Sequence, residues 1–331
     1  MSSRIPQGPV LITGGAGFAG SYLVESLIKS GRIVHILDRE RVAAYGENWD
    51  RTGIERHVVD LTNAKRLRNI LKKIQPRDIF HLAGRANVKH SWHGEAETYM
   101  ANVIGAVNLL CAVRDIDLAC NILIISSGEV YGLVSEEDQP ISERQMPEPR
   151  SPYAASKLCQ EIACLQLART IKGKMVVVRP FNHIGPGQRL GFVTADFAYQ
   201  IARIENNLQE PIILVGNLDA RRDFTDVRDT VEGYVSALRF GQNADIINVS
   251  SGQAWSVKEI LDTLLSRSKV NITVRVDPAL FRPADVPLLQ GDSTYLNQIS
   301  GWVPQYTISE TLGDILDYWR DRVLRFEVKR S

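Results

Sequence analysis

The chain has 331 residues, of which 44% are hydrophobic and 23% are charged, which is ordinary for a soluble globular enzyme. This composition excludes a disordered chain, and the length suggests about two domains. The 39 basic and 38 acidic residues leave a formal charge of +1, so no global field would hold nucleic acid or a membrane surface. Any bound anion must therefore be held by local charges or backbone amides.

The cysteines and the uncharged run near the N-terminus exclude further classes of protein. The four cysteines are too scattered for a disulfide framework, and no cysteine or histidine group has zinc-site spacing along the chain. We therefore expect reduced thiols, no metal and a cytoplasmic location. The uncharged run Ile5–Val24 holds five glycines and two prolines, so it is too polar for a membrane span and lacks a signal-peptide core.

The first half of the chain alternates β-rich runs with helical stretches, beginning with a strand at Val10–Thr13. A glycine turn and a helix to about Ser30 follow it. This alternation predicts an α/β fold, a Rossmann-type doubly wound parallel sheet, over residues 1–180. Later strands are expected at Ile33–Asp38, His57–Asp60, Asp78–Leu82, Asn121–Ser126 and Met175–Arg179, and later helices at Leu61–Ile74, Glu95–Arg114 and Pro152–Lys172.

Beyond Pro180 the pattern loosens into Gly- and Pro-rich loops, short strands and helices. We expect residues 181–331 to form mainly a smaller α/β substrate-binding lobe, with some segments returning to the first domain and a cleft between the two. The expected strands are Ile212–Val215, Ile246–Val249 and Val270–Val276, and the expected helices are Thr194–Glu205, Asp229–Phe240, Val257–Ser268 and Ile308–Arg325.

A glycine turn joins the first strand to the first helix. Gly14 permits the sharp turn, Gly17 lets a pyrophosphate approach the backbone, and Gly20 lets the helix lie close to the sheet. The free N–H groups and positive dipole of the helix N-terminus would face the phosphates, with Phe18 and Ala19 beside them. The strand–turn–helix context favours a dinucleotide site over a structural turn.

An acid at the end of the second strand indicates which dinucleotide is bound. Asp38 follows Gly20 by 18 residues, where a carboxylate accepts hydrogen bonds from the adenosine ribose and repels a 2′-phosphate. This favours NAD(H), but the adjacent Arg39 could hold a 2′-phosphate, which keeps NADP(H) open. Asp60 and Leu61 could contact the adenine, or Asp60 could cap a helix. The candidate cofactor set also contains Leu82 and Ala83.

A second constellation carries the chemistry. Tyr153 and Lys157 lie four residues apart on an expected helix and so share one face. A neighbouring ammonium would stabilise the phenolate and lower the pKa of the tyrosine. Ser127 follows the fifth strand, where parallel sheets place ligand-binding residues. Together with the glycine turn, these residues predict an oxidoreductase site.

Three C-terminal motifs narrow the prediction. The chain resembles the extended short-chain dehydrogenases/reductases that act on nucleotide sugars, and within them the group of GDP-mannose 4,6-dehydratases and GDP-6-deoxy-4-keto-mannose reductases. The resemblance covers nearly the full length. The motifs that carry it are Arg179–Gln188, Gly216–Phe224 and Arg282–Gly291, and the last continues to Gly301-Trp302.

The resemblance implies roles for individual residues. Ser127, Tyr153 and Lys157 would form the catalytic set, with Lys157 also holding the nicotinamide ribose. Arginine suits a diphosphate because its forked donors stay charged, although Arg222 could instead pair with neighbouring acids. The implied GDP-sugar contacts are Asn182 with the sugar or diphosphate, Arg222 and Arg282 with the pyrophosphate, Phe192 and Val193 with the base or sugar, and Asp285 with the ribose.

Two activities of this group compete. A 4,6-dehydratase needs a base for C5 and a proton donor for the leaving C6 hydroxyl. Glu129 could be that base, but Gly128 has no side chain to protonate the leaving oxygen. The sequence therefore favours reduction of a GDP-6-deoxy-4-keto-hexose to a GDP-rhamnose type of product. The dehydratase is second, followed by a nucleotide-sugar epimerase, which Asp38 would suit, and a non-catalytic cofactor-binding protein, which Tyr153 and Lys157 oppose.

Two helices carry more apolar positions than one buried stripe requires. They are Glu95–Arg114 and Pro152–Lys172. In the superfamily that the chain resembles, such helices pair into a four-helix bundle, so a homodimer is expected. The alternative is a helix pair buried within one chain.

Overall fold

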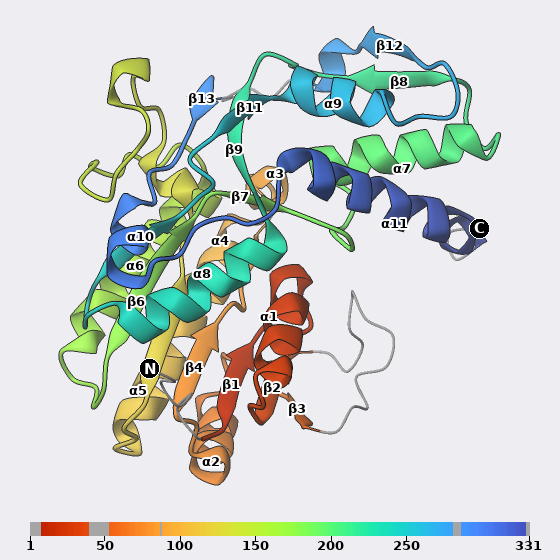
Figure 1. The fold of residues 1–331 in the computed structure, drawn as a ribbon. Coiled ribbons are helices and arrows are strands. Elements are labelled where there is room, and N and C mark those ends of the chain that lie inside the picture. Colours follow the sequence, from red (N-terminus) through yellow and green to blue (C-terminus); the bar gives the residue numbers. More distant parts are fainter. Residues whose placement is uncertain (1–7, 40–52, 87, 281–285, 329–331) are drawn as a thin grey trace.

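The computed structural model describes residues 8–39, 53–86, 88–280 and 286–328. Its centre is a seven-stranded sheet of order β10-β6-β5-β4-β1-β2-β3, in which every neighbouring pair is parallel (Figure 1). This confirms the predicted Rossmann-type sheet. Its strands are β1 (Val10–Thr13), β2 (Val34–Asp38), β3 (Ile54–Val58), β4 (Asp78–His81), β5 (Asn121–Ile125), β6 (Met175–Pro180) and β10 (Ile246–Val249).

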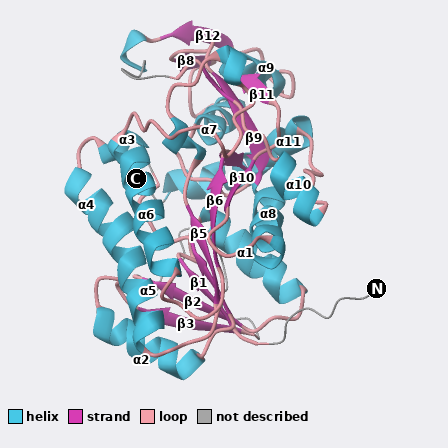
Figure 2. Ribbon diagram, turned by 90° about the vertical axis from the view of Figure 1, so that its left-hand side faces the viewer, coloured by secondary structure: helices cyan, strands magenta, loops and turns pink. Residues whose placement is uncertain are grey.

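Helices cover both faces of this sheet, one group on each side (Figure 2). One face buries apolar residues against α2 (Ala64–Ile74), α5 (Gly105–Asp115) and α6 (Pro152–Ala168). The other face buries them against α1 (Phe18–Lys29), α8 (Val227–Phe240) and α10 (Thr294–Ser300). Because both faces are covered, central strands such as β1 and β6 are wholly buried and mostly apolar, with Thr13 and Arg179 as their polar members.

A second lobe lies beyond the carboxyl ends of the strands, at the top of Figure 1. It has its own apolar core, formed chiefly by α7 (Val193–Glu205), α9 (Val257–Leu265) and α11 (Ile308–Val328). Two small sheets complete it: β7 (Asn182–Ile184), β9 (Arg221–Asp226), β11 (Ala254–Ser256) and β13 (Leu288–Leu289) form one, and β8 (Ile212–Val215) and β12 (Thr273–Val276) form the other.

Segments from the second half of the chain return to the first sheet, among them β10 and α8. β10 is its edge strand, with Ile247 opposite Val178 on β6. The helix α8 packs Val231 and Tyr234 into the core on that sheet. We expected some segments of residues 181–331 to return to the first domain, and β10 and α8 are two that do so. The short strands β7, β9, β11 and β13 escaped prediction because each is held by a distant partner.

Several predicted boundaries are wrong for local reasons. The third strand is Ile54–Val58 rather than His57–Asp60, because the Asp60 carboxylate accepts from the N–H (2.8 Å) and hydroxyl (2.7 Å) of Thr62 and forms a turn. The long helix expected from Glu95 is interrupted, with α4 (Glu95–Tyr99) passing through a π-helical turn (Met100–Ile104) into α5. The remaining short elements are α3 (Val88–Ser91) and 3₁₀ turns at Gly128–Tyr131, Glu136–Asp138 and Pro278–Leu280.

Candidate active site

The glycine turn between β1 and α1 has the predicted tight geometry. Gly14 has a φ of +73°, and a Cβ there would lie 2.7 Å from the backbone nitrogen of Ala83. A Cβ on Gly20 would collide with the carbonyl oxygen of Gly14. A Cβ on Gly17 would meet only that same oxygen, at 3.2 Å, so it would project into a cradle in front of α1. This cradle fits a pyrophosphate held by backbone N–H groups at the start of α1, where Phe18 and Ala19 follow.

Asp38 lies beside this turn, at the carboxyl end of β2. Its Oδ2 accepts a hydrogen bond of 2.8 Å from the N–H of Ala16, which fixes the carboxylate against the turn. Burial raises the pKa of Asp38 to about 6, while that hydrogen bond and the charges of Arg56 and Arg39 pull it down. Two positive side chains thus share the surroundings of the carboxylate proposed to contact the adenosine ribose, and Arg39 is exposed.

The other cofactor candidates divide into two groups. Leu82 and Ala83 lie against the glycine turn, since the N–H of Leu82 donates to the carbonyl of Thr13 at 3.0 Å. Leu61 is 8% exposed and packs into the core with α2 and α5. The expectation that Asp60 caps a helix is wrong, because the cap of α2 is Asn63, which accepts from Arg66 N–H at 3.1 Å.

Ser127, Glu129 and Tyr153 come together beyond the end of β5. Ser127 begins the 3₁₀ turn that carries Glu129, and its Oγ accepts from the N–H of Glu129 at 3.2 Å. Tyr153 lies in the first turn of α6 and is 8% exposed. Burial raises the pKa of Tyr153 to about 12; a hydrogen bond with Ser127 opposes this rise and the charge of Glu129 adds to it. The phenol is therefore protonated at neutral pH.

Lys157 lies one helical turn after Tyr153 and is also buried. Its Nζ donates to the carbonyl of Ile125 at 2.7 Å and to Oε1 of Gln160 at 3.0 Å. Burial lowers the pKa of Lys157 to about 8. The sequence predicted a lowered pKa for Tyr153, whereas the structure gives a raised one, because burial of the tyrosine outweighs the groups that lower its pKa.

Beneath these residues lies a buried polar network that sequence analysis missed. Arg179 on β6 donates from Nε (2.9 Å) and Nη2 (2.6 Å) to the two carboxylate oxygens of Glu161 on α6. Ser126 also donates to Glu161. The Arg179 guanidinium stacks 4.8 Å from the ring centre of Tyr131, whose hydroxyl donates to Asn248 at 2.7 Å. The available sequence signal was Arg179 within the apolar run of β6 and an acidic residue, Glu161, on the helix before it.

Asn102 is a second buried polar residue that the sequence did not predict. It lies wholly buried in the π-helical turn. Its Oδ1 accepts from the N–H of Arg85 at 2.8 Å, and its Nδ2 donates to Ser156 at 2.9 Å. Asn102 thus joins the loop after β4 to the helix that carries Tyr153 and Lys157, and its signal was an amide within an apolar helical run.

Those predicted substrate residues that the structure describes lie in the second lobe. Asn182 pairs with Phe224 across β7 and β9, so Arg222, two residues earlier on β9, shares a face of that sheet with Asn182. Phe192 caps α7 and Val193 is its first residue. The buried carboxylate of Asp223 accepts from the backbone and hydroxyl of Ser251 and from the N–H of Gly252, all within 2.8 Å. Arg282 and Asp285 lie outside the described residues.

Aromatic packing connects this lobe to the cofactor end of the sheet. Phe18 on α1 stacks on His183 of β7, with ring centres 5.9 Å apart. The hydroxyl of Tyr22 donates to the carbonyl of Pro186 at 2.8 Å. The strand that carries Asn182 is therefore held beside the glycine turn, which brings the two halves of the candidate site next to each other.

Comparison with known proteins identifies the group to which this architecture belongs. A family model described as GDP-mannose 4,6 dehydratase matches residues 11–315. The GDP-6-deoxy-D-mannose reductase of Pseudomonas aeruginosa is 36% identical over 314 residues, covering 95% of this chain and 98% of its own length.

Two solved structures are similar over almost the whole fold. RMD from Pseudomonas aeruginosa complexed with NADPH has a TM-score of 0.83 and 34% identity, covering 96% of this chain and 100% of its own. The UDP-glucose 4-epimerase of Thermus thermophilus in complex with NAD has a TM-score of 0.83 and 27% identity, covering 94% and 99%. These matches confirm the resemblance that the motifs indicated. The chain belongs to the GDP-mannose 4,6 dehydratase family, within the extended short-chain dehydrogenases/reductases.

Proposed function

We propose that this chain reduces the C4 ketone of a GDP-6-deoxy-4-keto-hexose, with a nicotinamide cofactor, to a GDP-rhamnose type of product. The observation that carries the proposal is a buried, protonated Tyr153 hydrogen-bonded to Ser127 and one helical turn from Lys157. The identity to the Pseudomonas aeruginosa GDP-6-deoxy-D-mannose reductase supports the same reaction.

Each side chain of the site has a separate role in this reaction. A reduced nicotinamide supplies the hydride when bound. Tyr153, whose pKa of about 12 keeps its proton in place, donates that proton to the alkoxide that develops at C4. Ser127 donates a hydrogen bond to the same oxygen, and the charged Lys157 stabilises the phenolate that Tyr153 becomes. Arg222 supplies forked donors for the diphosphate of the substrate.

The 3₁₀ turn after β5 favours the reductase over the dehydratase. A Cβ on Gly128 would lie 3.1 Å from the ring of Phe181, so a side chain there requires Phe181 to move. Gly128 itself therefore offers no proton donor for a leaving C6 hydroxyl, and a larger residue there would have to displace the Phe181 ring by a few tenths of an ångström. One observation favours the dehydratase: the charge of Glu129 acts on Tyr153, so a carboxylate able to take the C5 proton is close.

A direct assay separates the two activities. The protein is mixed with GDP-4-keto-6-deoxymannose and either NADH or NADPH, and the absorbance of the reduced nicotinamide is followed. Stoichiometric oxidation of the cofactor is the expected result. Absence of oxidation, together with loss of water from GDP-mannose in a parallel incubation with that sugar nucleotide, would instead establish the dehydratase.

We infer that NAD(H) is the preferred cofactor, because the Asp38 carboxylate would repel a 2′-phosphate. Asp38→Asn should therefore lower the KM for NADPH relative to NADH by about tenfold or more, equivalent to about 1.4 kcal/mol. The KM ratio is measured in the same preparation, so folding losses cancel. A wild-type preference for NADPH, which Arg39 and Arg56 would support, is the result that contradicts this inference.

The pKa of Lys157 predicts the pH dependence of the reaction. Its value of about 8 means that the ammonium is about 90% charged at pH 7, half charged near pH 8 and mostly neutral above pH 9. Since phenolate stabilisation requires the charge, kcat should be constant near pH 7 and fall above pH 8. A pH–rate profile measures this; a decline only near the ordinary lysine value of about 10.4 would show that burial does not control Lys157.

We propose that the chain forms a homodimer through a four-helix bundle built from the Glu95–Asp115 helical run and α6. Apolar side chains on these adjoining helices are exposed, including Met100 (49%), Ile104 (38%) and Ile162 (62%). The helical run Glu95–Asp115 is also long and apolar enough to span a membrane, judged by length and composition alone, but core helices of soluble proteins pass the same test. In its most apolar 18-residue stretch, 44% is buried inside the structure. Light scattering should give a dimer; a monomer at micromolar concentration would contradict the proposal.

A further inference from the structure

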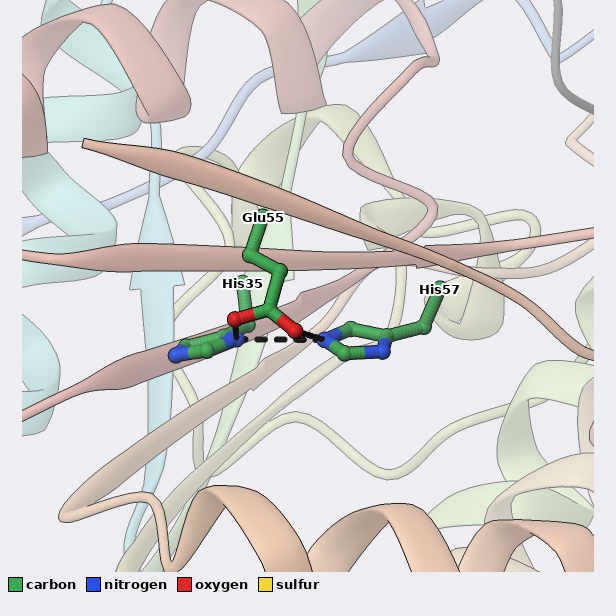
Figure 3. A group of neighbouring side chains, drawn as sticks. All are labelled: His35, Glu55 and His57. Carbon is green, nitrogen blue, oxygen red and sulfur yellow. Dashed lines mark hydrogen bonds and ion pairs between the residues drawn. The ribbon is translucent and has the colours of Figure 1, made fainter. Parts of the chain in front are cut away.

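Three metal-ligating side chains gather at the edge of the seven-stranded sheet, apart from the candidate active site. They are His35 on β2 and Glu55 and His57 on β3 (Figure 3). His35 Nδ1 and His57 Nε2 lie 3.1 Å apart. One oxygen of Glu55 lies 3.6 Å from the His35 nitrogen, and the other lies 3.7 Å from the His57 nitrogen.

The pairing of the two strands brings these side chains together. β3 runs parallel to β2 with His35 opposite Glu55 and Leu37 opposite His57. Glu55 and His57 are two residues apart on one strand, so they point to the same face of the sheet, as does His35. The cluster thus belongs to regular backbone rather than to a loop, and its ligands are held in place before any ion arrives.

We propose that His35, Glu55 and His57 bind one Zn²⁺ ion, with water in the fourth position. Two nitrogens at the observed separation, each about 2.05 Å from a zinc ion, subtend about 98° at the metal, close to tetrahedral geometry. The carboxylate approaches both nitrogens from the same side (Figure 3). Imidazole and carboxylate ligands together suit Zn²⁺ and related transition-metal ions.

Burial and charge prepare the cluster for a cation. His35 is 8% exposed and the side chain of His57 is 10% exposed, whereas that of Glu55 is 48% exposed. Burial lowers the pKa of both histidines, so both rings are neutral at pH 7. A neutral imidazole has a lone pair on one ring nitrogen, so the ion would bind the tautomers in which His35 Nδ1 and His57 Nε2 carry no proton, in place of the hydrogen bond that joins these atoms. The exposed carboxylate offers an entry path and supplies the negative charge.

Lys73 on α2 is the competitor for this site. Its Nζ contacts Oε1 of Glu55 at 3.1 Å, while Oε2 faces His35. A bound ion would take over the neutralisation of Glu55, so removing the lysine charge should favour the metal. Lys73→Gln is therefore expected to bind Zn²⁺ more tightly than the wild type.

The site would clamp the exposed edge of the sheet. β3 is the last strand of the sheet, and Glu55 and Arg56 are exposed. A metal ion bound by side chains of both β2 and β3 would link the two strands in addition to their backbone hydrogen bonds. His35 lies three residues before Asp38 on the same strand, so the clamp would also hold the strand that ends at the cofactor site.

The test is Zn²⁺ binding to the metal-stripped full-length protein, measured by calorimetry, with tetrahedral Co²⁺ absorption as a second readout. The variants are His35→Gln, His57→Gln and the surface change Glu55→Ala, which should fold even if a buried histidine variant does not. His93→Gln, at an exposed histidine, is the matched control.

One Zn²⁺ per chain is expected in the wild type and in His93→Gln. Glu55→Ala should weaken binding by at least about tenfold, and the histidine variants at least as much. Bound Zn²⁺ should also raise the Tm of the wild type, because the site exists only in the folded chain. Absence of Zn²⁺ binding by the wild type, or equal affinity in Glu55→Ala, would overturn the proposal.

Discussion

Tyr153→Phe should lower kcat by about 10²–10⁴-fold, the usual contribution of a positioned general acid. The substitution removes only the hydroxyl that donates the proton to the C4 oxygen. The backbone contact that places the residue, from the N–H of Tyr153 to the hydroxyl of Ser91 at 3.2 Å, does not depend on it. Steady-state kinetics with the keto sugar measures the loss.

Binding separates this effect from misfolding. Because Tyr153 contributes no contact to the nucleotide in our account, the affinity for GDP, measured by calorimetry, should be nearly unchanged in Tyr153→Phe. Undiminished turnover would refute the proton-donor assignment. Loss of GDP binding together with turnover would show instead that the hydroxyl supports the structure of the site.

Glu161→Leu should destabilise the fold by about 3–5 kcal/mol, because it leaves the Arg179 guanidinium buried without its carboxylate. The two side chains are 2% and 4% exposed and are joined by two hydrogen bonds. Urea unfolding measures the change in the free energy of unfolding. The same loss is expected for Arg179→Met, which strands the carboxylate.

The double variant Glu161→Leu, Arg179→Met tests whether the unpaired buried charge causes this loss of stability. Replacing both members of a buried ion pair by apolar residues is often close to neutral. The double variant should therefore recover much of the stability that either single variant loses. Additive losses would mean that packing volume, rather than an unpaired charge, determines the cost.

Local sequence patterns were sufficient to predict those site residues whose positions are set by residues close to them in the sequence. The glycine turn is a strand, three glycines and a helix within a short run, and Tyr153 and Lys157 lie one turn apart on one helix. Each arrangement is a property of a single element or junction, so spacing alone predicted its geometry. Spacing did not predict the pKa of Tyr153, which depends on burial by the rest of the fold.

Long-range pairs escaped for a different physical reason. Glu161 and Arg179 meet because α6 packs on β6, and His35 meets His57 because β3 pairs with β2. Neither juxtaposition has a signature in local spacing. Close spacing of cysteines and histidines along the chain therefore could not indicate a histidine pair 22 residues apart. For the same reason, the sequence predicted the strand β10 but not its pairing with β6, which lies more than sixty residues earlier.

The central claim is hydride delivery to C4 of a GDP-linked keto sugar, and isotope transfer tests it most directly. The protein is incubated with GDP-4-keto-6-deoxymannose and a nicotinamide cofactor deuterated at the transferable position, and the product is analysed by NMR. The account predicts deuterium at C4 of the sugar, with one cofactor oxidised per sugar. A product without deuterium at C4, or a cofactor that remains reduced while the protein removes water from GDP-mannose in a parallel incubation, would contradict it.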